Sequence, residues 1–201
     1  MIFGTLICLT ACASSPKYSP FDGKVGYWEQ ELAPGVYQVY IQIPEDTDKY
    51  FRYNYLTLRM AQLCEKAGYS YFDESSSGSA TKVRETPNGI VEGEVVFCLK
   101  SPLRKSLNVQ LDEENGVVVT KVYNPVTSKI ENGDTIFEVN GTLVKNNPTI
   151  KLAVYKLDPE AKSVKVKVKR NDKTLTVDQP LEQTNTVIGP DRYEELKQQF
   201  L

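Results

Sequence analysis

The stretch GDTIFEVNG, residues 133–141, follows a regular order of turn, strand and turn. Two glycines bracket a segment in which Ile136 and Val139 stand among polar residues. Glycine permits backbone turns at positions where a side chain would obstruct the chain. The pattern therefore predicts a short strand in the middle of a folded unit. We expect Asp134 to orient the first turn and to take no part in chemistry.

The segments around this strand predict further strands and one helix. Asn147 can cap a helix that has Pro148 at its first position, where the missing amide costs no hydrogen bond. An apolar stripe follows at helical spacing, and it consists of Ile150, Ala153, Val154 and Leu157. The predicted strands are residues 107–111, 117–122, 164–168 and 175–177.

The run KVKVKVKR contains a strict alternation of valine and lysine. In a strand, such alternation places one residue type on each face. We expect Val164, Val166 and Val168 to point inward and the lysines to point into solvent. A solvated strand face accounts for these charges without a polyanion site.

The first half of the chain predicts a second folded unit. Val36–Ile43 (VYQVYIQI) alternates, and a helix is expected to begin near Thr47 or Asp48, since an aspartate stabilises the positive end of a helix. A further strand is expected at residues 95–99. The order strand, helix, strand predicts a helix packed across a small antiparallel sheet. The apolar stripe of this helix is Tyr53, Leu56, Met60, Leu63, Cys64 and Ala67.

The first eleven residues are apolar or small and precede Cys12, which is typical of a secretory signal too short to span a bilayer. The four residues LTAC resemble a bacterial lipobox. This resemblance implies removal of residues 1–11, a lipidated (palmitate-bearing) Cys12, and a lipoprotein of the outer membrane that faces the periplasm. An ordinary cleaved signal is the alternative. The Ser- and Pro-rich residues 12–26 are expected to form a flexible tether.

The two units carry separate family resemblances. ELAPGVYQVYIQI and LTLRMAQLCEKAGYSYF, within residues 31–99, resemble a family of small proteobacterial lipoproteins whose function is poorly known. Residues 103–181 resemble a PDZ domain, in which GDTIFEVNG matches the G-D-x-I-x-x-V-N-G stretch of bacterial envelope proteases. These resemblances imply an α+β fold: a small antiparallel sheet with one packed helix, followed by a PDZ-like, partly open β-barrel with two helices. The expected domains are residues 27–100 and 101–183, with a tail at 184–201.

The PDZ resemblance implies a peptide-binding site. PDZ domains bind an extended peptide as an added strand and hold its C-terminal carboxylate in a nest of backbone amides. Ser106-Leu107-Asn108-Val109 match the loop that forms this nest, and Asn108 stands where glycine is usual. Ile150 and Val154 are candidates for the apolar pocket on the helix, or alternatively for the core. The expected peptide-binding residues are Leu107, Asn108, Val109, Leu111, Ile150 and Val154.

Composition argues against several other functions. The net charge is −2, which does not favour nucleic-acid binding, and the chain has no histidine. Without an imidazole there is no Ser–His–Asp triad, and we expect no metal, no cofactor and no enzymatic activity. Removal of the signal and lipidation of Cys12 would leave two further cysteines, Cys64 and Cys98. They form either a disulfide or two buried thiols.

We therefore expect a lipid-anchored periplasmic adaptor that captures the C-termini or exposed strands of envelope proteins. The alternative is a structural or homo-oligomerising lipoprotein whose PDZ edge is used internally. The last residues place Tyr193, Leu196 and Phe200 on one helical face. This end either docks in the protein's own groove or in that of a neighbouring molecule, or it forms an amphipathic helix that lies on the surface of a domain or frays.

Overall fold

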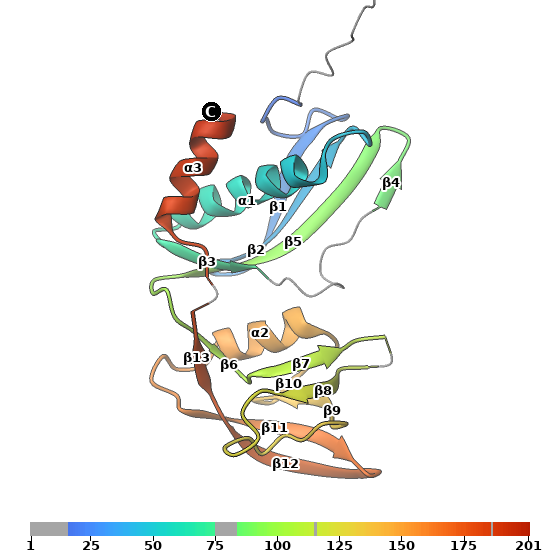
Figure 1. Ribbon diagram of the computed structural model, residues 1–201, viewed down its shortest axis with the longest axis vertical. Helices are drawn as coiled ribbons and strands as arrows, with labels where there is room; N and C mark the ends of the chain where they lie inside the picture. Colours follow the sequence, from blue (N-terminus) through green and yellow to red (C-terminus); the bar gives the residue numbers. More distant parts are fainter. Residues whose placement is uncertain (1–15, 75–83, 115, 186) are drawn as a thin grey trace, which may run out of the picture.

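The computed structural model describes residues 16–74, 84–114, 116–185 and 187–201, which fold into two α+β units (Figure 1). The signal segment and Cys12 lie outside the described residues. The first unit contains β1 (Gly26–Ala33), β2 (Val36–Ile43), α1 (Lys49–Lys66), β3 (Tyr71–Glu74), β4 (Arg84–Thr86) and β5 (Gly89–Leu99). The second contains β6 (Arg104–Ser106), β7 (Val109–Asp112), β8 (Val118–Val122), β9 (Thr135–Val139), β10 (Thr142–Leu143), α2 (Asn147–Tyr155), β11 (Ser163–Arg170), β12 (Lys173–Pro180) and β13 (Glu182–Thr184). The chain ends with α3 (Pro190–Phe200).

The first unit is the expected antiparallel sheet covered by a helix. Its strands follow the order β1-β2-β5-β3, and β4 pairs with β5. Val39, Ile41 and Ile43 are fully buried beneath α1, so the alternation in β2 predicted its core face correctly. The helix begins where the sequence indicates, because the Asp48 carboxylate accepts the amide of Tyr50 at 2.8 Å.

The predicted stripe of α1 was wrong at its two ends. Tyr53 is 44% exposed and Ala67 is also exposed, whereas Tyr55 is fully buried. Tyr55 lies on a second covered side of α1, against which α3 and the rings of Tyr18 and Tyr27 pack (Figure 1). The ring of Phe200 meets that of Tyr55 edge-on, with 5.8 Å between their centroids.

The expectation of a flexible tether fails for its described end. Tyr18 packs against the rings of Tyr27 and Tyr55, with centroids 4.9 and 4.7 Å away. The amide of Ser19 donates to the Tyr55 hydroxyl at 3.0 Å, and Pro20 forms a bridge with Tyr27. Aromatic burial therefore holds this segment on the first unit.

A disulfide joins Cys64 of α1 to Cys98 of β5. Of the two states left open for these cysteines, the structure contains the bonded one. The bond ties the helix to the central strand of the sheet, across a sequence separation of 34 residues.

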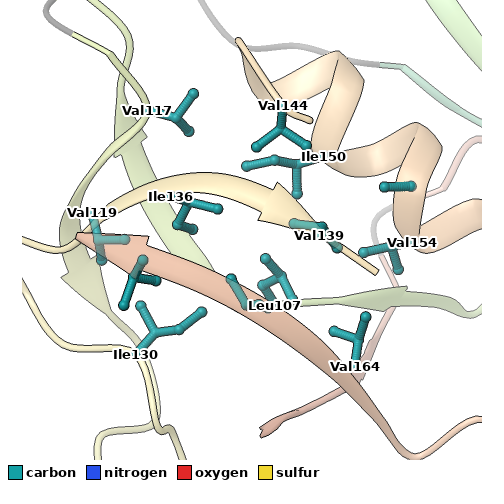
Figure 2. Packing of buried hydrophobic residues seen from close by; sticks show 13 residues of the cluster. Leu107, Val117, Val119, Ile130, Ile136, Val139, Val144, Ile150, Val154 and Val164 are labelled. Atoms are coloured by element: carbon teal, nitrogen blue, oxygen red, sulfur yellow. The ribbon is translucent and has the colours of Figure 1, made fainter. Parts of the chain in front are cut away.

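The second unit contains a sheet of order β12-β11-β9-β8-β7, with β10 paired to β9 and α2 packed beside it, and a two-stranded sheet of β6 and β13. It is not a closed barrel, and its described residues contain one helix instead of the expected two. The helix is capped one residue earlier than expected: Asn146 accepts the amide of Thr149 at 3.0 Å. Figure 2 shows the core, in which Ile136 and Val139 of the GDTIFEVNG stretch are buried between α2 and the neighbouring strands.

Asp134 has the structural role expected of it. Its side chain is inaccessible to solvent, accepts the amide of Glu131 at 2.9 Å and pairs with Arg170 at 2.7 Å. The valines of the alternating run, Val164, Val166 and Val168, are buried as predicted.

The chain returns to the first unit after β13. Ile188 bridges to Phe72 of β3, and α3 then buries Leu196 completely against α1. Tyr193, Leu196 and Phe200 do share one packed face, as the spacing predicted. The terminal helix therefore lies on the first unit, away from any groove of the second.

Within the described residues, no helix combines the length and apolar character needed to cross a membrane.

Candidate functional site

A groove runs between β7 and α2. β7 is the edge strand of its sheet, since in the described residues it pairs with β8 alone. The cavity beside it has a volume of about 620 Å³. All six residues expected to bind peptide line this one cavity, although they come from a loop, a strand and a helix: Leu107, Asn108, Val109, Leu111, Ile150 and Val154.

The open edge of β7 presents backbone groups to the groove. The carbonyl of Asn108 accepts the amide of Tyr123 at 3.2 Å, and the carbonyl of Gln110 accepts the Thr120 hydroxyl at 3.2 Å. Both carbonyls therefore point toward β8. Because backbone groups alternate in direction along a strand, the N–H and C=O of Val109 point away from β8. An extended peptide could pair with them.

The loop before β7 has the backbone geometry of an anion nest. Asn108 has a φ of 56°, in the left-handed region that glycine, asparagine and aspartate adopt most readily. Its own amide donates to the Ser106 hydroxyl at 3.0 Å, and its side-chain amide donates to the Glu182 carboxylate. Within the described part of the chain, the Leu107 N–H has no hydrogen-bond partner. The amides of Leu107 and Val109 could thus meet a carboxylate.

The floor of the groove is apolar. Leu107, Ile150 and Val154 are 4%, 5% and 6% exposed and belong to the core of the second unit. Ile150 and Val154 project from α2 toward the strands (Figure 2). They were left open as either core or pocket, and the structure places them in both: they pack in the core and line the groove. An apolar side chain of a ligand would extend this core.

A charged cluster that sequence reasoning missed stands at the groove. Asp73 of β3, in the first unit, lines the cavity and pairs with Arg104 at 3.1 Å and with Lys151 at 3.2 Å. Lys151 also donates to the carbonyl of Glu74 at 2.6 Å. Burial raises the pKa of Asp73 and lowers the pKa of Lys151, and in each case the opposite charge of the partner offsets part of the shift.

The two units meet along the other side of α2. Tyr155 packs on Phe97 of β5, with ring centroids 5.9 Å apart, and its hydroxyl donates to the Cys98 carbonyl at 3.0 Å. A second cavity of about 580 Å³ lies beside this contact and shares the cluster of Asp73, Arg104 and Lys151 with the groove. The first unit therefore supports the helical wall of the groove.

Glu74 is the other unusual acid, and it lies outside the groove. It accepts the hydroxyls of Tyr53 at 3.0 Å and of Thr57 at 3.2 Å, both from α1. Burial raises the pKa of Glu74 to about 7, and the nearby Glu94 adds to this effect. Its surroundings belong to the core of the first unit.

Comparison with known proteins supports the assignment of the second unit. Residues 106–181 match the family model described as PDZ domain. No curated protein matches the chain. The second unit is thus a PDZ domain, a module for protein interaction.

Proposed function

We propose that the PDZ domain at residues 106–181 binds extended peptides, and that the whole chain is a lipid-anchored periplasmic adaptor without catalytic activity. The observation that carries this proposal is the edge of β7, whose Val109 N–H and C=O face a groove with an apolar floor. Envelope proteins that expose a C-terminus or a strand are the expected partners.

The bound peptide would form a further strand beside β7. Its C-terminal carboxylate would approach the amides of Leu107 and Val109, where the Asn108 loop turns. Its last side chain would lie on Ile150 and Val154, and an apolar residue would be preferred there because both are buried hydrophobic groups.

The proposed location follows from the first residues of the chain and from the cysteines. The lipobox-like LTAC predicts an anchor at Cys12 and an outer-membrane protein facing the periplasm. The disulfide between Cys64 and Cys98 supports this location, because disulfides persist in oxidising compartments such as the periplasm.

The alternative is a structural role, and one observation favours it: the wall of the groove, α2, is already packed against the first unit through Leu152 and Tyr155. Among the described residues, however, no strand of the first unit pairs with the edge of β7. In the structural alternative, the edge of β7 would bind no foreign peptide and would instead pair with a second copy of the chain.

Binding of labelled ten-residue peptides ending in Val, Leu, Ile or Phe to the soluble chain tests the proposal. Fluorescence polarisation should show saturable binding, weaker for peptides that end in Asp or Lys. Asn108→Val should weaken binding about tenfold, because a β-branched residue disfavours the left-handed backbone of the nest, whereas Asn108→Gly should retain it.

A change in the floor provides an independent comparison. Val154→Asp should abolish binding, and Val126→Asp, at a valine that is 89% exposed in the same unit, should leave it unchanged. A buried charge at Val154→Asp also threatens folding. The comparison of Asn108→Val with Asn108→Gly therefore decides whether the nest binds peptide. Absence of binding by the wild-type chain, together with a concentration-dependent dimer in sedimentation, would support the structural alternative.

A further inference from the structure

We propose that Asp73 is a specificity-determining residue of the groove, and that its negative charge weakens the capture of free C-terminal carboxylates relative to internal extended segments. This inference deepens the proposed function and depends on it. It gives the first unit a direct part in recognition, since Asp73 belongs to β3.

The protein's own Asp73 carboxylate lies beside Arg104 and Lys151 in the groove. Asp73, Arg104 and Lys151 line the same cavity as the Leu107–Val109 amides. The Asp73 side chain is 7% exposed, and it binds both the Arg104 Nε and the Lys151 Nζ through its Oδ2. Two of the three cationic side chains that line the groove are thus already engaged with an internal carboxylate, and the third, Lys105, donates to the carbonyl of Ala161.

A peptide that ends in this groove brings a second carboxylate into the same cavity. Two like charges in a partly buried site repel each other, and water screens them poorly there. The two carboxylates also compete for the same cationic donors, Arg104 and Lys151. A peptide that enters as an internal strand uses the edge of β7 and the apolar floor without this repulsion.

The arrangement also links binding to the contact between the units. Lys151 uses two of its three donors on β3, one for Asp73 and one for the Glu74 carbonyl. A terminal carboxylate that draws Lys151 or Arg104 toward itself does so at the expense of the ion pairs with Asp73. Asp73 therefore sets how favourable a free carboxylate is in the groove.

The test compares wild type with Asp73→Asn in the full soluble chain, because asparagine keeps the shape of the side chain and removes its charge. The probes are the ten-residue peptides ending in Val, Leu, Ile or Phe, each as a free acid and as a C-terminal amide. We expect Asp73→Asn to bind the free acids about tenfold more tightly, and to bind the amides within about twofold of wild type. High salt should reduce the difference.

Asp46→Asn is the matched control, since Asp46 is an exposed aspartate of the same unit, in the turn between β2 and α1. It should leave both kinds of peptide unaffected. Tighter binding of acids and amides alike would overturn the inference, because it would indicate a general loosening of the units. Unchanged or weaker binding of the acids would overturn it too, while the peptide-binding function would stand.

Two further outcomes separate the inference from the proposed function. If the wild-type chain binds no peptide and Asp73→Asn binds free acids alone, the inference is supported in its strongest form. If neither chain binds any peptide, the proposed function fails, and the role of Asp73 in specificity fails with it.

Discussion

Two neighbouring acids of β3, Asp73 and Glu74, have opposite surroundings because successive side chains of a strand point to opposite faces. Asp73 faces the second unit and its two basic partners, Arg104 and Lys151. Glu74 faces α1 and accepts two hydroxyls there. Two consecutive residues of β3 therefore serve different parts of the molecule: Asp73 lines the groove, and Glu74 is buried against α1.

Glu74 predicts a specific pH dependence of stability. Its pKa in the folded state, about 7, lies above its ordinary value of 4.5, so the folded chain binds the proton more tightly than the unfolded chain. Its stabilising contribution is complete below about pH 4.5 and is lost as the pH rises through 7. We expect Glu74→Gln, which resembles the neutral carboxyl, to be within about 1 kcal/mol of wild type at pH 5 and to be more stable by about 3 kcal/mol at pH 8.

Urea unfolding of both chains at several pH values measures this difference. Glu74→Asp serves as a control that keeps a carboxyl group and shortens its reach. Parallel stability curves for wild type and Glu74→Gln between pH 5 and pH 8 would contradict the raised pKa.

At the scale of elements, α2 has two packed sides and α3 completes the helical layer of the first unit. Ile150, Ala153 and Val154 of α2 face the core of the second unit, while Leu152 and Tyr155 face the first. α3 adds Leu196 and Phe200 to the aromatic surface of α1. The single apolar stripe predicted from spacing therefore describes α3, but it does not describe all the packed sides of α1 or α2.

The packing of α3 predicts a cost for truncating its buried leucine. Leu196 is completely inaccessible to solvent, so Leu196→Ala leaves a cavity between α3 and α1 and should destabilise the chain by about 2–4 kcal/mol. Leu201→Ala, at a leucine that is 74% exposed, should change stability by less than about 0.5 kcal/mol. Equal effects of the two substitutions in thermal unfolding would show that α3 does not pack on α1.

At the scale of the whole molecule, the PDZ unit is inserted between β5 and α3 of the first unit (Figure 1). The units are held together by two chain connections and by two contacts. One contact is the charged cluster of Asp73, Arg104 and Lys151, and the other is the apolar contact around Tyr155. Val36, Val95 and Phe97, on the sheet face away from α1, are buried in this contact. Such an arrangement favours unfolding of the two units as one cooperative structure.

Removal of the Tyr155 ring should make the two units unfold separately. Tyr155→Ala deletes the contact with Phe97 and the hydrogen bond to Cys98, and calorimetry should then show two transitions where wild type shows one. Tyr123→Ala removes a tyrosine that is 53% exposed in the same unit and should preserve the single transition. Two transitions in the wild-type chain would mean that the units are independent.

The six residues of the groove were predicted from the resemblance to PDZ domains, whereas local pattern by itself determined the core strands, the start of α1 and the turns around GDTIFEVNG. These features depend on periodicity and on the conformations of glycine, asparagine and proline, which act over a few residues. β1 was missed because its burial pattern lacks a clear alternation, and pairing with β2 holds it in place. The tethered Tyr18 was missed for a similar reason, since its partners lie on β1 and α1.

Only the tertiary structure decided which surfaces meet. Periodicity indicates that a side chain is buried, and it does not identify the element that covers it. The docking of α3 on α1, the support of α2 by the first unit and the entry of Asp73 into the groove all join residues that are distant in the chain. Such contacts depend on how two folded surfaces fit together, and this fit exists only once both have formed.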